Sequence, residues 1–247
     1  MKLENPYVSR IVLVVNTNIE KRIRYMSEDI ENHFSKIVKS QAIATNVPDS
    51  SPPDVPRFQL RDKDKVISIS QNTLQFELDY FSQKKSFEQL SVHFNKILSE
   101  FYNKCLDFKK NGKIKFFGLI VIFNRKSKLD KYEGNASCYK KLFNVKEMGN
   151  VENFNFSSGF FDKDKKIFIN IGLNIYEIRK GDFQIGDLTF ESKFIEIESF
   201  PVEERGIEIK IDVNNKPSVG GSNVDSFNVL YGELVNACEF YKELILK

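Results

Sequence analysis

Hydrophobic and polar residues alternate along several short stretches of the chain, and this alternation predicts β-strands. In 73–80 and 206–213 every second residue is aliphatic or aromatic, and the residues between them are mostly polar or charged. A period of two places the apolar side chains on one face of a strand whose other face is exposed. Further strands are expected over 8–16, 57–61, 65–70, 113–123, 152–160, 166–176 and 192–200.

Helices are expected where apolar residues recur at spacings of three and four. This spacing is found in 19–38, in 86–108 and in 227–245. Ser86 and Gln89 have the spacing of a capping box, which predicts that the second helix begins there. The four prolines of 46–56 predict a loop, and 124–150 is expected to be polar and irregular apart from a short helix around 139–143.

The order of these elements predicts an α+β protein. Helices do not alternate regularly with strands, so we expect a mainly antiparallel sheet with three amphipathic helices packed on one face. Two organisations stay open. One has an N-terminal β-α-β-β-β-α-β lobe over 1–125 and a β-rich C-terminal lobe with the terminal helix over 126–247, and the other is one continuous domain. No internal repeat is visible in the sequence.

The composition of the 247 residues excludes several classes of protein. A hydrophobic content of 41% is too high for a disordered chain. The longest apolar run, 116–123, is far shorter than the roughly 20 residues of a membrane helix. Three cysteines without a CxxC motif suit a reducing compartment, and the N-terminus lacks the apolar core of a secretion signal. We therefore expect a cytoplasmic protein that has no membrane partner.

The residues that carry most chemistry do not form a recognisable motif. His33 and His93 lie beside apolar helix stripes, and neither has metal-ligand spacing to a Cys, Asp or Glu. Cys105 and Cys238 fall on apolar helix faces, whereas Cys138 falls in the polar segment and is a candidate for an exposed thiol. We therefore predict no catalytic residue, no metal site and no cofactor.

Two weaker patterns keep an enzyme open as the lowest of three hypotheses. The carboxylates of Glu196 and Glu198 share a strand face, and Glu203-Glu204 follow Pro201, so a metal-dependent enzyme is conceivable. The bland interpretation is the solvated side of a strand. Gly220-Gly221-Ser222 lacks the lysine and the glycine spacing of a phosphate-binding loop, and it reads as a linker with Ser222 as a helix cap.

The informative feature is the distribution of positive charge. The net charge of the chain is only +3, but residues 104–146 carry +9 and the remainder carries −6. Dense lysine can bind phosphates, with Tyr132, Tyr139 and Phe143 available for stacking, or it can bind an acidic protein; a solvated lysine-rich surface is the third interpretation. The candidate binding residues are Lys109, Lys110, Lys113, Arg125, Lys126, Lys128, Lys131, Lys140 and Lys141.

Several local strings resemble a sporadically distributed, uncharacterised family of prokaryotic proteins of about this length. They are Asn5-Pro6, Arg57-Phe58-Gln59-Leu60, Val66-Ile67-Ser68-Ile69, Phe87-Glu88-Gln89-Leu90, the stretch from Gly118-Leu119 to Asn124-Arg125, and the terminal helix with Cys238. The family has no established activity, so the resemblance implies no catalytic role. Its patchy distribution implies an accessory gene, for example in a mobile, defence or toxin–antitoxin locus.

These observations lead to two main hypotheses besides the enzyme. The first is a non-enzymatic binding or interaction protein with a protein partner, which includes a homodimer with a second copy of itself. The alternative is a nucleic-acid-associated accessory protein that uses the lysine-rich segment 104–146.

Overall fold

The fold is that of a computed structural model, and the structure describes residues 4–48, 50–108, 114–143, 149–180, 200–216 and 227–246. Within these residues the chain is α+β, as predicted, with nine strands in one sheet and four α-helices, one helix more than expected. The strands are β1 (Tyr7–Asn16), β2 (Ile43–Ala44), β3 (Phe58–Asp62), β4 (Lys65–Ile69), β5 (Thr73–Asp79), β6 (Phe116–Lys126), β7 (Asn155–Asp162), β8 (Ile167–Arg179) and β9 (Val202–Asn214). The helices are α1 (Ser27–Phe34), α2 (Phe87–Phe108), α3 (Lys131–Phe143) and α4 (Phe227–Leu246), with short 3₁₀ turns at Ile23–Tyr25 and Phe81–Gln83.

The strands follow the order β2-β3-β4-β5-β1-β6-β9-β8-β7 across the sheet. The order reveals a repeat that the sequence does not show. Along the chain, β1-α1-β3-β4-β5-α2 is followed by β6-α3-β7-β8-β9-α4. In the sheet, β1 and β6 are neighbours. The other strands of the first run follow one another outward from β1, and those of the second run follow one another outward from β6. The sheet therefore contains the same order of elements twice, with β2 as an addition to the first.

Contacts divide the chain into two compact units, each built from separate segments. Unit 1 comprises Met1–Pro6, Asn124–Ser157 and Gly172–Ile209, and unit 2 comprises Tyr7–Phe123, Ser158–Ile171 and Lys210–Lys247. The lobe boundary near residue 125 stays a prediction.

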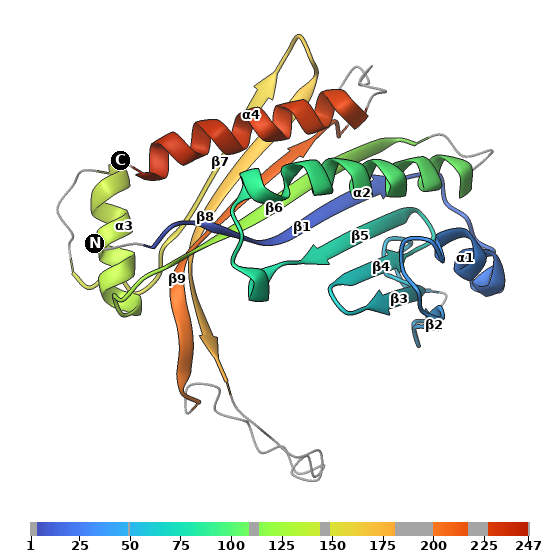
Figure 1. Cartoon of the computed structure of the whole chain (residues 1–247), viewed down its shortest axis with the longest axis horizontal. Helices are drawn as coiled ribbons and strands as arrows, with labels where there is room; N and C mark the ends of the chain where they lie inside the picture. The colour runs from blue at the N-terminus through green and yellow to red at the C-terminus, as the bar shows by residue number, and fades with distance from the viewer. Residues whose placement is uncertain are drawn as a thin grey trace. The chain divides into compact units, whose positions relative to one another are not determined.

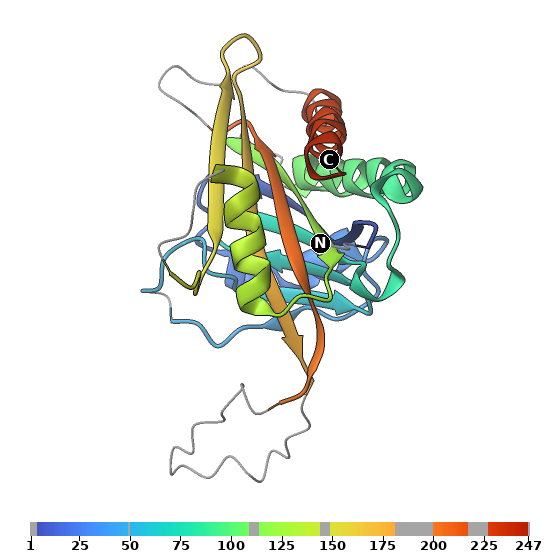
Figure 2. The same cartoon turned by 90° about the vertical axis from the view of Figure 1, so that its left-hand side faces the viewer.

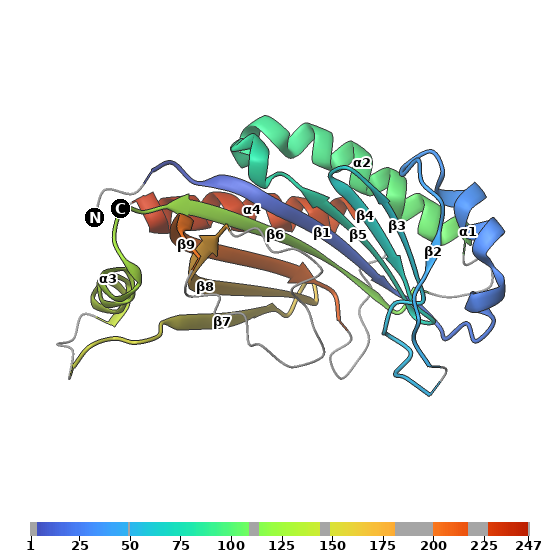
Figure 3. The same ribbon diagram turned by 90° about the horizontal axis from the view of Figure 1, so that it is seen from below.

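The core of unit 2 is a set of apolar rows that cross β3, β4, β5 and β1. Leu60, Ile67, Phe76 and Leu13 are direct neighbours in adjacent strands, and all four are fully buried. The opposite face of these strands carries polar pairs such as Gln59 opposite Ser68, as the alternation in the sequence predicts. Figure 3 shows these strands with α2 lying across them.

Helix α2 covers these rows with a stripe of aromatic and aliphatic side chains. The ring of Phe101 stacks on that of Phe76 with centroids 4.9 Å apart. On its other flank α2 meets α4, where Phe227 contacts Tyr102 and the Tyr231 hydroxyl donates to the carbonyl of Ser91 at 2.6 Å (Figure 1). The predicted capping box is present in part, because Ser86 N–H donates to the side chain of Gln89 at 3.0 Å.

Two predicted elements differ from the structure, and two others cannot be compared with it. The first helix is shorter than 19–38, because residues 17 and 20 donate backbone hydrogen bonds to Asn72 and Gln71 instead of entering a helix. Segment 124–143 is more regular than expected, since it contains the end of β6 and the 13-residue α3, whose last turn is the short helix expected around 139–143. The predicted strand 192–200 and the Gly220-Gly221-Ser222 linker lie outside the described residues.

The proline-rich loop 46–56 is fastened by a single buried arginine. Arg57 is 1% exposed, and its guanidinium donates to the carbonyls of Val55 at 2.9 Å and Ser51 at 3.0 Å. A loop with four prolines has few backbone N–H groups to pair its own carbonyls, so the guanidinium supplies the missing donors.

We expect Arg57→Met to lower the free energy of unfolding by about 2–3 kcal/mol, because the carbonyls of Ser51 and Val55 would lose the hydrogen bonds of the buried guanidinium. Urea unfolding followed by circular dichroism measures this change. Arg61→Met, at an exposed position of the neighbouring strand β3, is the control and should change stability by no more than about 0.5 kcal/mol. Equal losses in the two variants would contradict this role for Arg57.

Candidate functional site

The predicted basic residues fall in different surroundings in the structure. Lys109, Lys110 and Lys113 lie outside the described residues. Arg125 and Lys126 close β6, and Lys128 lies in the following turn. Lys131, Lys140 and Lys141 are exposed on α3. The exposed cations that the structure places on one short stretch of chain are therefore Lys128, Lys131, Lys140 and Lys141.

Arg125 has a structural contact that separates it from this group. It is 8% exposed, and its Nε donates to the carbonyl of Glu4 at 2.7 Å. Burial lowers the pKa of its guanidinium. The N–H of Glu4 in turn donates to the carbonyl of Lys126 at 3.2 Å. Arg125 thus helps to hold the N-terminal segment along the end of β6.

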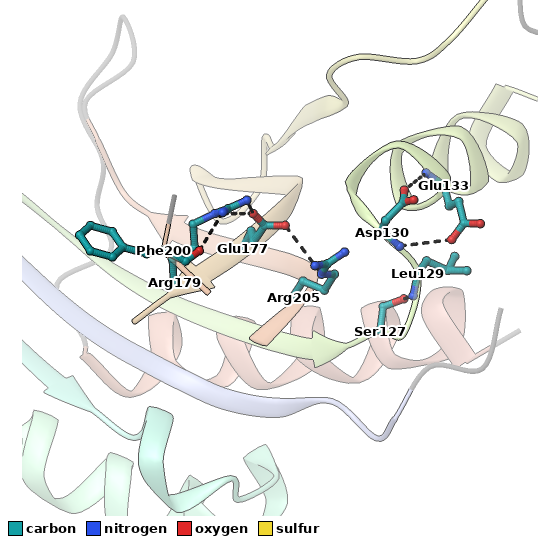
Figure 4. Close-up of polar contacts among 8 residues, drawn as sticks. All are labelled: Ser127, Leu129, Asp130, Glu133, Glu177, Arg179, Phe200 and Arg205. Atoms are coloured by element: carbon teal, nitrogen blue, oxygen red, sulfur yellow. Dashed lines mark hydrogen bonds and ion pairs between the residues drawn. The ribbon is translucent and has the colours of Figure 1, made fainter. Parts of the chain in front are cut away.

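The start of α3 is fixed by a reciprocal cap (Figure 4). The side chain of Asp130 accepts from the N–H of Glu133 at 2.9 Å, and the side chain of Glu133 accepts from the N–H of Asp130 at 3.2 Å. Ser127 Oγ accepts from the N–H of Leu129 at 3.1 Å and shapes the turn that leads in. The carboxylates of the cap satisfy N–H groups that would otherwise attract an anion at this helix end.

The buried face of α3 is made of small and polar side chains. Gly134, Asn135 and Cys138 are buried, and the amide of Asn135 donates to the carbonyls of Val151 at 3.1 Å and Glu152 at 3.0 Å. Figure 2 shows α3 (yellow-green) in front of β8 and β9. A helix with this buried face has no apolar stripe on that side, which is why the sequence predicted only a short helix around 139–143.

The outward side of α3 carries aromatic residues beside its lysines. Tyr132 is 52% exposed and Phe143 is 49% exposed, and the ring of Tyr139 lies 5.3 Å from that of Phe143. Residues 132, 136, 139 and 143 follow the four-three-four spacing of one helix face. We call the following exposed residues the α3 surface: Lys128, Lys131, Tyr132, Lys140, Lys141, Leu142 and Phe143.

A cluster of two arginines around one carboxylate lies at the ends of β8 and β9 (Figure 4). Arg179 donates through Nε to Glu177 at 2.7 Å and through a second nitrogen to the same oxygen. The other oxygen of Glu177 lies 3.7 Å from Nε of Arg205. Arg179 also donates to the carbonyl of Phe200 at 2.9 Å. The sequence did not predict this cluster, because Glu177 and Arg205 are far apart in the sequence and come together only when β8 pairs with β9.

This cluster borders a hollow between α3, β8 and β9 that is too small for a substrate. Its lining includes Asp130, Gly134, Ile175, Glu177 and Arg205, and it has room for about one water molecule. Both oxygens of Glu177 face guanidinium groups, so the carboxylate is already engaged in ion pairs. The arrangement joins strands rather than forming a cavity for small-molecule chemistry.

The other residues considered from the sequence have structural partners. Nε2 of His33 lies 2.7 Å from the carbonyl of Lys104, and the ring of His93 packs against Tyr80. Glu203 is exposed and Glu204 is buried, where it accepts a hydrogen bond from the Tyr176 hydroxyl at 2.7 Å. The two carboxylates therefore do not converge. Glu196 and Glu198 lie outside the described residues.

Cys138 is not exposed, contrary to its expected place in a polar loop. It is 4% exposed in α3, and burial raises the pKa of its thiol to about 11, although Lys141 acts in the opposite direction. Cys105 is fully buried, and burial also raises the pKa of Cys238.

In the part of the chain that the structure describes, no group of three or more His, Cys, Asp or Glu residues is arranged to hold a metal ion. The described helices include none that is long and apolar enough to cross a membrane. A scan with protein-family models and a search of curated proteins found no match to this chain.

We expect all three thiols to resist modification in the folded protein. At pH 8 a thiol with a pKa of about 11 is ionised in about one molecule in a thousand, and burial also blocks the reagent. A chromogenic disulfide reagent should therefore release little colour until urea is added, and should then report three thiols. Rapid reaction of one thiol in the native protein would contradict the burial of Cys138.

The end of β6 and strand β9 approach each other closely at Gly206. A Cβ at this position would overlap the carbonyl oxygen of Arg125, whereas a Cβ at Gly232 in α4 would meet nothing within 4 Å. We expect Gly206→Ala to lower the free energy of unfolding by about 2 kcal/mol or more, because the backbone must move apart. Gly232→Ala, the matched control, should raise it by up to about 1 kcal/mol, because alanine favours a helix. Urea unfolding of the two variants measures both effects, and a neutral Gly206→Ala would refute the close approach.

Proposed function

We propose that this chain is a non-enzymatic binding protein and that the α3 surface holds an acidic protein partner. The observation that carries the proposal is the exposure of Tyr132 and Phe143 on the same helix as the exposed Lys131, Lys140 and Lys141. Aromatic side chains dominate the cores of protein interfaces, and lysines are found mostly at their rims. This surface has both kinds of residue.

The way α3 is held supports this proposal. The cap formed by Asp130 and Glu133 fixes the N-terminus of the helix. The hydrogen bonds that the side-chain amide of Asn135 donates fix the buried face of the helix. The exposed side chains are therefore presented on an element that needs little ordering when it binds, which lowers the entropic cost of association.

A nucleic acid is the second candidate, because lysines with aromatic residues also suit phosphates and stacked bases. The carboxylates of Asp130 and Glu133 at one end of α3 would repel a phosphate backbone and an acidic protein alike, so titration with DNA distinguishes the two partners. We further infer a cytoplasmic protein, because its three cysteines are free and buried. An accessory role in a mobile, defence or toxin–antitoxin locus follows from the resemblance alone, and the product of the adjacent gene is the first partner to test.

We expect the double variant Lys140→Glu/Lys141→Glu to weaken binding of that product by about tenfold or more, because the reversed charges repel an acidic surface. Tyr132→Ala/Phe143→Ala should weaken it at least as much through lost burial. Lys36→Glu/Lys39→Glu is the control, since it changes the net charge equally at exposed positions outside α3. Isothermal titration calorimetry gives the affinities.

The same proteins should be titrated with single- and double-stranded 20-nucleotide DNA at about 50 and 200 mM salt. Affinity for DNA that falls steeply with salt and is lost in Lys140→Glu/Lys141→Glu would support the nucleic-acid candidate and overturn the protein partner. Equal binding by the α3 and control variants would overturn the α3 surface for either partner.

A further inference from the structure

Strand β7 ends the sheet among the described strands and has none of the lysine or proline residues that usually protect an edge. Its sequence from Asn155 to Asp162 contains no Lys, Arg or Pro, and its single charge is at its last residue. Phe160 is 52% exposed and Phe161 is 40% exposed, with the ring of Phe161 against that of Phe168 on β8. Figure 2 shows β7 (yellow) at the outer side of its hairpin with β8.

An edge strand of this kind pairs readily with another strand, because its outward backbone groups have no neighbour within the sheet. Native proteins usually place lysine, proline or a bulge at such an edge to prevent this. The other end of the sheet is different. It is formed by β2, which has only two residues, Ile43 and Ala44.

We propose that β7 is the interface of a homodimer, in which two copies pair antiparallel around Gly159 and join their sheets into one. This proposal concerns a different surface from α3 and does not depend on the function proposed above. It gives the homodimer predicted from the sequence a specific interface.

The sequence of β7 is complementary to itself in this register. A two-fold axis perpendicular to the sheet keeps each side chain on the same face, so Gly159 lies opposite its own copy. Phe161 then faces Ser157, Phe160 faces Ser158, and Asp162 faces Phe156. No two like charges are opposed, and the exposed Phe160 side chains of the two copies become diagonal neighbours, a distance that aromatic rings can span.

This pairing also joins only two copies and does not continue into an open-ended series of copies. Pairing of β7 with β7 uses the same edge of both copies and leaves only β2 at each end of the joined sheet. A two-residue strand offers too few backbone groups to continue the assembly. The dimer is therefore closed.

The register can be tested by cross-linking. Opposed residues of antiparallel strands have Cα atoms about 4.5–5.5 Å apart, within the range of a disulfide. Gly159→Cys should therefore give a covalent dimer on mild oxidation, seen by non-reducing electrophoresis after free thiols are blocked. Ser157→Cys is the matched control, because its two copies would be about 13 Å apart along the strands and cannot be bridged. Cross-linking of Ser157→Cys without Gly159→Cys, or of neither, would overturn the register.

Light scattering coupled to size exclusion tests the dimer without a new cysteine. The wild-type chain should have twice its monomer mass of 28.7 kDa at about 0.1 mM and dissociate on dilution, as expected for a small interface. Phe160→Lys should give a monomer, because a lysine opposes pairing at the edge. Phe240→Lys, at a 59% exposed position on α4, should leave the dimer intact.

Ser157→Lys is a second variant in case Phe160→Lys does not fold, because Ser157 is small and exposed. Circular dichroism shows which variants are folded. The proposal would be overturned if the wild-type chain is monomeric at about 0.1 mM. It would also be overturned if β7 pairs with a strand of another protein instead of a second copy. A dimer that survives both edge substitutions would overturn it as well.

Discussion

The register of the antiparallel strands is the constraint on which the rest of the structure depends. Phe76 meets Phe101 of α2 only because Leu13, Phe76, Ile67 and Leu60 form one row across four strands. A slip of one residue would turn this row to the other face and place Gln75 and Glu77 under the helix. The turns oppose such a slip. Lys63 adopts a positive φ of 46° between β3 and β4, and Ser70 Oγ accepts from the N–H of Thr73 at 2.8 Å between β4 and β5.

Where side-chain chemistry and burial agree, the sequence predicts the structure. The alternation of 73–80 predicts β5, and the aromatic stripe beginning at Phe87 predicts α2, because each buries one uniformly apolar face. In the hairpin between β7 and β8, the side chain of Asp162 accepts from the N–H groups of Asp164 and Lys165, which is the local hydrogen bonding typical of Asp in a turn.

Where burial is achieved by small or polar groups, hydrophobic spacing gives no signal. Helix α3 buries Gly134, Asn135 and Cys138, and it is stabilised by amide hydrogen bonds instead of an apolar stripe. The spacing of Asp130 and Glu133 was the available signal, since it is that of a reciprocal helix cap. The pairing of Glu177 with Arg205 had no local signal at all, because the two residues meet only through the β8–β9 pairing.

Burial also separates the arginines of this chain from its lysines. Arg57 and Arg125 are buried, and their guanidinium groups donate to the backbone carbonyls of Val55 and Glu4. Both fork-shaped groups can serve several acceptors at once, which the single ammonium of a lysine does less well. The lysines of α3 are exposed instead, on the same helix as the exposed aromatic rings of Tyr132 and Phe143. Buried arginines thus stabilise the fold, and the exposed lysines of α3 form the charged part of the surface that we propose for binding.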